Sequence, residues 1–382
     1  MPALDFEAWF RLLAVPGMTR PMARRLLQAL GSPQAVLGAS ASQWSAAAGP
    51  AAAHTLSTPD PLANARLQLA LDWLAGHPDR HVLNLGDGQY PRPLLHCGDP
   101  PLMLFLEGRL ELLHRPSVAV VGSRQATPQG LAHARHFASV LSHAGVTVVS
   151  GLATGIDGAA HEGALEGAGS TLAVIGTGPD IVYPRRHSGL WRRIAQDGLV
   201  VSEHAPGTPA LAHHFPHRNR IIAGLTQGTL VVEAALKSGS LITARLAMEG
   251  GREVFAVPGS IQSPQAKGCH ELIRQGAQLV ESAQEILESL GLPASPTNSS
   301  AAPVAAAAAA VSDAPDGADD PDPCSPHGRL LRALGHDPVS LDTLVGRTGD
   351  AASVLGARLL ELELQGLVAR LPGGRFQRQQ VG

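Results

Sequence analysis

Hydrophobic and polar positions follow one repeated order between Ser117 and Ala277: a short apolar strand, a glycine-bearing polar loop and then a helix. Apolar, β-branched runs of this kind are typical of parallel strands buried on both faces. The pattern predicts strands at 117–121, 146–149, 171–175, 199–202, 229–232 and 253–257. It predicts intervening helices near 128–144, 158–168, 187–196, 217–225 and 240–250. We therefore expect an α/β fold whose parallel sheet is built from βαβ crossovers.

The residues before this block follow a helical pattern. Residues 4–75 form amphipathic stretches separated by proline and glycine, and residues 86–101 are rich in loop formers. The segment VPGMTRPMARRLLQAL (15–30) resembles a helix-hairpin-helix, with Met18 in the place of that motif's usual second glycine. The alternative is a small helical bundle that docks on the next domain.

The residues after the block divide into a linker and a small domain. From Gly291 to about Pro326 the chain is rich in Ala, Pro, Ser and Asp, a composition that buries too little surface to order itself. The last 55 residues predict three helices and a β-hairpin, the layout of a winged helix. The third helix carries Arg358 among acidic residues, so DNA contact, protein binding and an accessory role all stay open. The predicted segments are a helical SAM/helix-hairpin-helix-like domain (1–80), the α/β domain (81–290), a flexible linker (291–325) and a winged helix (326–382).

Composition bears on three properties of the protein: nucleic-acid binding, disulfide or zinc content, and membrane association. The 382 residues are 44% hydrophobic with a net charge of −3, yet residues 115–274 hold 14 Lys and Arg against 10 Asp and Glu, a local excess of about +4 that leaves −7 for the flanks. A nucleic-acid surface would therefore be a patch on the central block. Three scattered cysteines favour a reducing cytosol over disulfides or a zinc site. Because no apolar run approaches ~18 residues and the first residues lack signal-peptide order, we expect a soluble cytoplasmic protein without membrane contact.

The glycine-bearing loops predict a phosphate site, because parallel strands that end at helix N-termini gather backbone N–H groups along one sheet edge. In GSRQATPQG (122–130), Gly122 allows close backbone approach and Arg124 offers a planar fork for phosphate. A surface arginine on a loop is the alternative for Arg124. The loops match neither GxGxxG nor GxxxxGK[ST], which argues against NAD and P-loop chemistry.

Two further loops hold candidate functional side chains. In SGLATGIDGAAH (150–161), Asp157 and His161 are either a helix cap and a packed histidine or an acid/base pair. In FPHRNRIIAG (215–224), Phe215 beside Arg218 and Arg220 resembles the aromatic and cationic platform of single-strand binders. The alternative is that Phe215 belongs to the core and the arginines extend outward. No carboxylate or cysteine accompanies the nearby histidines, so we expect no metal site.

Lys237 and Glu233 lie near the last of these loops. Lys237, one of two lysines in the chain, is in KSGSLITA, where small residues permit close approach to phosphate. Glu233 in GTLVVEA resembles the glutamate of nucleotide phosphoribohydrolases of the lysine-decarboxylase-like group, although that motif's arginine and PGG are absent. The alternative is that Glu233 pairs with an arginine such as Arg220.

Taken in order, these motifs resemble the DNA-processing protein A (DprA/Smf) family. The resemblance spans Ser117 to about Ser289 and rests on VAVVGSR, VVSGLATGIDGAAH, VIGTGPDIVYP, FPHRNRIIAGL, VVEAALKSGSLITA, EVFAVPGSI and GCHELIRQGAQLV. It implies an extended Rossmann-like fold, a homodimer, binding of single-stranded DNA, and loading of RecA recombinase during natural transformation. It implies no catalytic activity and no cofactor.

The resemblance also implies which residues contact DNA. Members of the family often carry a basic residue after the YP of the loop GTGPDIVYP (176–184), and Arg185 matches it. Ala212 and His213 replace a basic residue that some members place before FP. The DNA-contacting residues expected in this way are Gly122, Ser123, Arg124, Gly151, Arg185, Phe215, Arg218, Asn219, Arg220, Lys237 and Ser240. A phosphoribohydrolase that uses Glu233 and a duplex-DNA regulator that uses the winged helix are the alternative functions.

Overall fold

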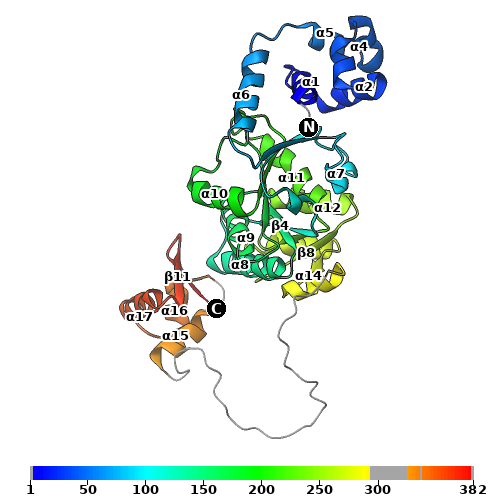
Figure 1. Ribbon diagram of the computed structural model, residues 1–382. Helices are drawn as coiled ribbons and strands as arrows, with labels where there is room; N and C mark the ends of the chain where they lie inside the picture. The colour runs from blue at the N-terminus through cyan, green and yellow to red at the C-terminus, as the bar shows by residue number, and fades with distance from the viewer. Residues whose placement is uncertain (1–2, 293–324, 336–337, 380–382) are drawn as a thin grey trace.

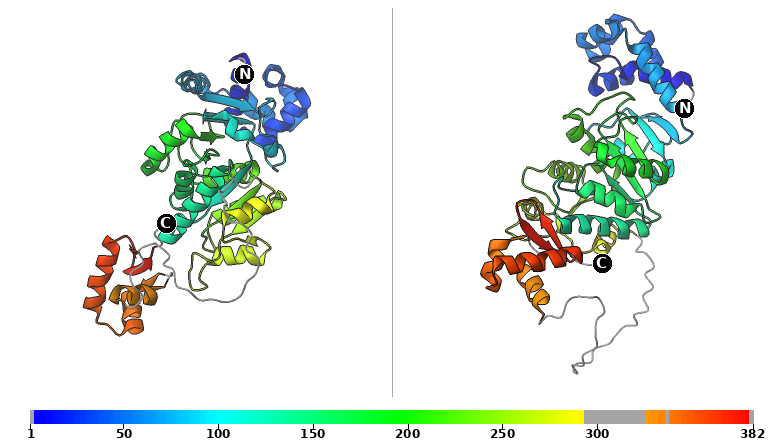
Figure 2. Two further views of the ribbon diagram at one scale, coloured as in Figure 1. Left: turned by 60° about the horizontal axis from the view of Figure 1, so that its bottom comes forward. Right: turned by 90° about the vertical axis from the view of Figure 1, so that its left-hand side faces the viewer.

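A nine-stranded sheet forms the centre of the molecule in the computed structural model, which describes residues 3–292, 325–335 and 338–379. The N-terminal helices lie at one end of this central domain and the small C-terminal unit lies at the other, as all three views show (Figure 1, Figure 2). None of the described helices is both long and apolar enough to cross a lipid bilayer.

The sheet is mostly parallel. Its strand order is β1-β2-β6-β5-β4-β3-β7-β8-β9, in which β3 to β9 are parallel while β2 pairs antiparallel with both β1 and β6. The chain moves from β3 outward to β6 and then crosses back to place β7 on the other side of β3. The strands are β1 (Arg80–Asn84), β2 (Met103–Gly108), β3 (Ser117–Val121), β4 (Thr147–Ser150), β5 (Thr171–Ile175), β6 (Leu199–Ser202), β7 (Gly228–Val231), β8 (Glu253–Ala256) and β9 (Gln278–Leu279).

Helices cover both faces of this sheet, as the continuous apolar strands require. One face packs against α11 and α12 through Ile222 and Ala244, and the other packs against α8 and α9 through Phe137 and Ala160. The helical elements of the central domain are α7 (Arg92–Leu95), η1 (Leu110–His114), α8 (Pro128–His143), α9 (Ile156–Ala164), η2 (Arg185–His187), α10 (Ser188–Asp197), α11 (His214–Leu225), α12 (Ser240–Glu249), α13 (Lys267–Arg274) and α14 (Ala283–Ser289).

The N-terminal helices dock on the antiparallel edge of the sheet. Phe6, Trp9 and Trp73 from these helices share one apolar core with Phe105 of β2. Thr19 caps the second helix by accepting a hydrogen bond from the Met22 N–H group. These contacts agree with a helical bundle that packs on the next domain. The helices are α1 (Ala3–Leu13), α2 (Arg20–Leu30), α3 (Pro33–Gly38), α4 (Ala41–Ala48), α5 (Pro50–Ser57) and α6 (Ala63–Ala75).

The C-terminal unit has the three helices and hairpin that the sequence predicts. On its third helix, Arg358 is paired with Asp350 at 2.6 Å and Glu361 with His327 at 2.8 Å, so this helix offers no free cationic face. Gln377 donates a hydrogen bond to Gln129 of α8 at 3.0 Å. The predicted linker at 291–325 lies almost entirely outside the described residues. The elements are α15 (Pro326–Leu334), β10 (Val339–Ser340), α16 (Leu341–Thr348), α17 (Ala352–Leu364), β11 (Val368–Leu371) and β12 (Arg375–Arg378).

The predicted α/β fold class is confirmed. The six predicted strands are present as β3 to β8, each within one residue of its expected bounds. Strands β1, β2 and β9 were not predicted from the sequence. The helix expected near 158–168 is shorter, because Gly163, Gly167 and Gly169 allow closely packed turns before β5 begins.

Candidate nucleic-acid interface

A cavity of about 530 Å³ lies at the carboxyl ends of β3 and β7, where the strand order reverses. Open α/β sheets bind their ligands at this kind of topological switch point. The loops after β3, β4 and β7 and the first turns of α11 form its walls. Eight of the eleven predicted DNA-contacting residues line it: Gly122, Ser123, Arg124, Phe215, Arg218, Asn219, Lys237 and Ser240.

Two hydrogen bonds from the segment after β4 hold the loop after β3, and with it Arg124, at the cavity. The Ser123 carbonyl oxygen accepts a hydrogen bond from the Ile156 N–H group at 3.1 Å, and the Arg124 carbonyl oxygen accepts one from Thr154 Oγ1 at 3.2 Å. The Arg124 side chain itself is exposed and makes no ion pair with a carboxylate of the described residues. Gly122 is required by packing, because a Cβ there would lie 2.6 Å from Ile156 Cγ1.

Aromatic and cationic side chains meet at the cavity mouth. The Arg124 guanidinium carbon lies 5.8 Å from the centre of the half-buried Phe215 ring, within the range of cation–π attraction. The ring of Tyr183, which is 48% exposed, packs against Phe215 at a centroid distance of 5.2 Å, with the two ring planes tilted by 41°. Tyr183 was not among the predicted site residues, although its position two residues before Arg185 was a usable signal.

Arg218 fixes α11 to the sheet from inside the cavity wall. Its side chain is buried, and Nη1 donates to the carbonyl oxygens of Gly151, at 2.5 Å, and Val174, at the ends of β4 and β5. Burial lowers the pKa of the Arg218 guanidinium to about 10, and the nearby Asp157 opposes this shift, so the group remains charged at neutral pH. Gly151 is needed because a Cβ would lie 2.1 Å from Arg218 Nη2. Gly151 therefore supports the site without lining the cavity.

Asp157 and His161 have structural partners. Asp157 accepts hydrogen bonds from the N–H groups of Gly151 and Ala153, so it organises the preceding loop and does not cap α9. Burial raises its pKa, while Arg218 and these two N–H groups act in the opposite direction. His161 Nε2 accepts from Leu152 N–H, and burial lowers the pKa of His161 to about 3. Packing orients this histidine, as the first of the two interpretations expects.

The opposite wall of the cavity is formed where β7 leads into α12. Lys237 is exposed there, and Ser240 begins α12 with its hydroxyl 2.7 Å from that of Ser238. Asn219 of α11 donates to the Gly239 carbonyl oxygen at 3.3 Å, which ties the two walls together. The start of α12 contributes the positive end of a helix dipole to the same space as Arg124 and Lys237.

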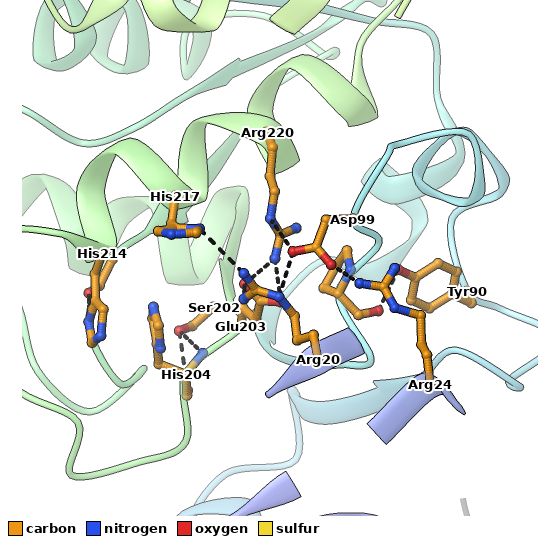
Figure 3. Close-up of polar contacts among 12 residues, drawn as sticks. Arg20, Arg24, Tyr90, Asp99, Ser202, Glu203, His204, His214, His217 and Arg220 are labelled. Atoms are coloured by element: carbon orange, nitrogen blue, oxygen red, sulfur yellow. Dashed lines mark hydrogen bonds and ion pairs between the residues drawn. The ribbon is translucent and has the colours of Figure 1, made fainter. Parts of the chain in front are cut away.

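Arg220 does not line this cavity. Figure 3 shows its guanidinium directed toward Glu203 and Asp99, with Arg20 of the N-terminal domain reaching the same two carboxylates. Arg24 also pairs with Asp99. Burial lowers the pKa of Arg220, and Glu203 opposes that shift. Arg220 therefore belongs to an ion-pair cluster that joins the helical domain to α11. The remaining predicted residue, Arg185, lies on η2 outside the cavity lining and is exposed.

Glu233 faces a second cavity, of about 460 Å³, on the other side of the β3 loop. Its carboxylate accepts hydrogen bonds from Thr127 N–H at 2.9 Å and Thr127 Oγ1 at 2.5 Å, at the start of α8. The expected pairing of Glu233 with Arg220 is wrong, because Arg220 pairs with Glu203 and Asp99. Burial raises the pKa of Glu233, and both hydrogen bonds from Thr127 oppose that shift. The carboxylate thus completes the cap of α8 and does not face the Arg124 cavity.

We expect Glu233→Ala to destabilise the start of α8 by about 1–2 kcal/mol, because the Thr127 N–H group loses its partner. Hydrogen exchange of the first α8 amides measures this loss. Glu233→Gln keeps an acceptor and serves as the matched control, with exchange close to wild type. Release of adenine from AMP by the wild-type protein, abolished in Glu233→Gln, would contradict a purely structural role.

The arrangement favours binding over bond cleavage. Cations, the start of α12 and the Phe215 ring line the first cavity, and groups of these kinds hold phosphates and unpaired bases. Its one carboxylate, Asp157, is engaged by Gly151 and Ala153.

Sequence comparison relates the chain to proteins of one family. A family model described as DNA recombination-mediator protein A matches residues 81–291, and one described as the DprA winged helix domain matches residues 312–374. Protein Smf of Escherichia coli (strain K12) is 44% identical over 314 residues, which cover 81% of this chain and 80% of that protein. DNA processing protein DprA of Streptococcus pneumoniae (strain ATCC BAA-255 / R6) is 51% identical over 201 residues, covering 53% and 71%.

Solved structures give the same relationship. The X-ray structure of DprA from Streptococcus pneumoniae matches with a TM-score of 0.65 and 39% identity, covering 74% of this chain and 97% of that one. A structure of DNA processing protein A from Helicobacter pylori, described by its single-stranded DNA binding mode, matches with a TM-score of 0.51 and 31% identity, covering 55% and 95%. Together with the switch-point cavity, these matches show that the chain belongs to the DNA recombination-mediator protein A (DprA/Smf) family.

Proposed function

We propose that the protein binds single-stranded DNA at the switch-point cavity and acts as a non-enzymatic mediator that loads RecA recombinase on the strand. In this role it protects incoming DNA during natural transformation and recombination in the cytoplasm. Family membership supports a DNA-processing role, and the single-strand binding named for the Helicobacter pylori relative supports the nature of the ligand.

The observation that carries the proposal is the contact between the tilted rings of Phe215 and Tyr183 beside the exposed cations Arg124 and Lys237. Phe215 and Tyr183 offer π-faces to unpaired bases, and Arg124 and Lys237 offer charge to the phosphates between them. No sequence preference is expected, because every base has a π-face and phosphates are the same along the strand. A duplex keeps its bases stacked on each other and cannot use the aromatic pair.

The family resemblance also leads us to propose a homodimer. Two cavities on one strand would raise the overall affinity without any new contact, through effective concentration. Sedimentation measurements give the oligomeric state, and a purely monomeric protein at micromolar concentration would contradict the dimer.

The decisive experiment is fluorescence anisotropy of a labelled single strand of thirty-five bases and of its duplex, each titrated with protein at two salt concentrations. We expect tight, salt-sensitive preference for the single strand. Equal binding of both forms, or binding of neither, would refute the proposal. A duplex-specific signal from residues 325–382 would favour the winged-helix regulator instead.

Arg124→Ala should reduce the salt dependence of single-strand binding. One phosphate contact contributes about 0.7 to the slope of log K against log salt, so the slope should fall by that amount. Arg124→Lys keeps the charge and should keep most of the slope. An unchanged slope in Arg124→Ala would remove this residue from the site.

A further inference from the structure

Four exposed arginines lie within nine residues of each other where β5 leads into α10. Arg185 and Arg186 are on η2, and Arg192 and Arg193 are on α10. Within the described part of the chain, none of the four makes an ion pair with a carboxylate. By contrast, the exposed Arg135 of α8 is paired with Glu166.

Helix geometry places the α10 arginines on one open surface. Positions 189, 192, 193 and 196 share the outer face of α10, while Leu190 and Ile194 are buried against the sheet. A Cβ built on Gly189 would meet nothing within 4 Å, and Arg192, Arg193 and Gln196 are exposed, so the described residues leave this face open. Trp191 packs with the buried residues, and the outer surface therefore presents charge without an aromatic ring.

This surface is continuous with the cavity. Tyr183 packs against Phe215 at the cavity mouth and is two residues before Arg185 in the chain. His187 Nδ1 lies 3.0 Å from the Leu152 carbonyl oxygen, which holds η2 against the loop after β4. A DNA strand with one base on Phe215 can therefore leave the cavity past Tyr183, then past η2, and then along α10.

We propose that Arg186, Arg192 and Arg193, together with Arg185, form a second phosphate-binding surface for the part of the strand outside the cavity. We call these four residues the arginine patch. The inference rests on the proposed function and extends it, since it assigns a direction to the bound strand. Because the patch has unpaired guanidinium groups and no exposed aromatic ring, it recognises the sugar–phosphate backbone only.

The test is a length series of labelled oligothymidylates, from four to thirty-five nucleotides, titrated with the full-length wild-type protein and with Arg192→Ala/Arg193→Ala. The variant should bind the shortest detectable strand like wild type. It should bind the longest one roughly three- to thirtyfold more weakly, with a salt slope lower by about 1.4 for two lost phosphate contacts. Arg192→Lys/Arg193→Lys should keep that slope, which separates charge from an effect on folding.

Arg25→Ala/Arg92→Ala removes two exposed arginines of α2 and α7 that make no ion pair within the described residues, and it controls for net charge. If the α10 variant matches wild type at every length, or weakens all lengths equally, the arginine patch does not hold the emerging strand. Either result leaves cavity binding in place. Failure of the wild-type protein to bind any strand would instead refute the proposed function itself.

Discussion

Phe215→Ala should weaken single-strand binding by ten- to hundredfold while leaving the fold intact. Stacking of a base on an aromatic side chain contributes roughly 1–3 kcal/mol. Phe215 is only half-buried and packs with Tyr183 and Arg124, so its truncation leaves no large internal cavity. The loss is measured by anisotropy at fixed salt, and the salt slope should stay unchanged because no phosphate contact is removed.

Two further variants of Phe215 test whether the loss of binding comes from the aromatic ring or from the lost apolar volume. Phe215→Tyr keeps an aromatic face and should bind within a few-fold of wild type, whereas Phe215→Leu keeps apolar volume and should bind as weakly as the alanine variant. If Phe215→Leu bound single-stranded DNA as tightly as wild type, residue 215 would contribute packing alone and the stacking role would be wrong.

Arg218→Ala should destabilise the central domain by about 2–4 kcal/mol. The substitution removes a buried charge and leaves the carbonyl oxygens of Gly151 and Val174 without their donor, each at a cost of about 1–3 kcal/mol before relaxation. Asp157 also loses the positive charge that opposes the rise in its pKa. Hydrogen exchange of the α11 and β5 amides measures the local loss, and DNA binding should fall with it.

Arg218→Lys separates the effect of the positive charge on stability from the effect of the planar guanidinium group. A lysine keeps the positive charge but cannot reproduce the planar fork that spans two carbonyl groups, so we expect an intermediate loss of stability. The exposed Arg245 on α12 offers a matched control, and Arg245→Ala should leave exchange unchanged. Normal α11 protection in Arg218→Ala would show that this side chain is not a fastening point.

The sequence predicted the central sheet well because its strands are apolar runs between glycine-rich loops. It did not predict β2, because Met103–Gly108 contains no β-branched residue and follows a loop-rich stretch. The two-residue β9 is too short to produce a periodic signal. Burial of β2 depends on Trp73 and Phe105, which contact each other only after the chain has folded.

The residues of the candidate site were predicted from sequence motifs. The wrong placement of Arg220 at the cavity has a geometric cause. Arg218 and Arg220 are two residues apart on α11, so their side chains point about 200° apart around the helix axis. One therefore reaches the cavity wall and the other reaches Glu203 and Asp99. A motif names both residues without this distinction. The partner Asp99 lies 121 residues from Arg220, and local sequence gives no signal for such a contact.

The ion-pair cluster that joins the helical domain to α11 makes the local charge of the central domain depend on the helical domain. Asp99 and Glu203 face Arg20, Arg24 and Arg220, which sums to a local charge of +1. Without residues 1–80, Arg20 and Arg24 are lost, and the same spot carries −1. This reversal lies only two residues along the helix from Arg218. The helical domain thus supplies a counter-charge to the central domain, and removing it would make the electrostatic potential beside the cavity more negative.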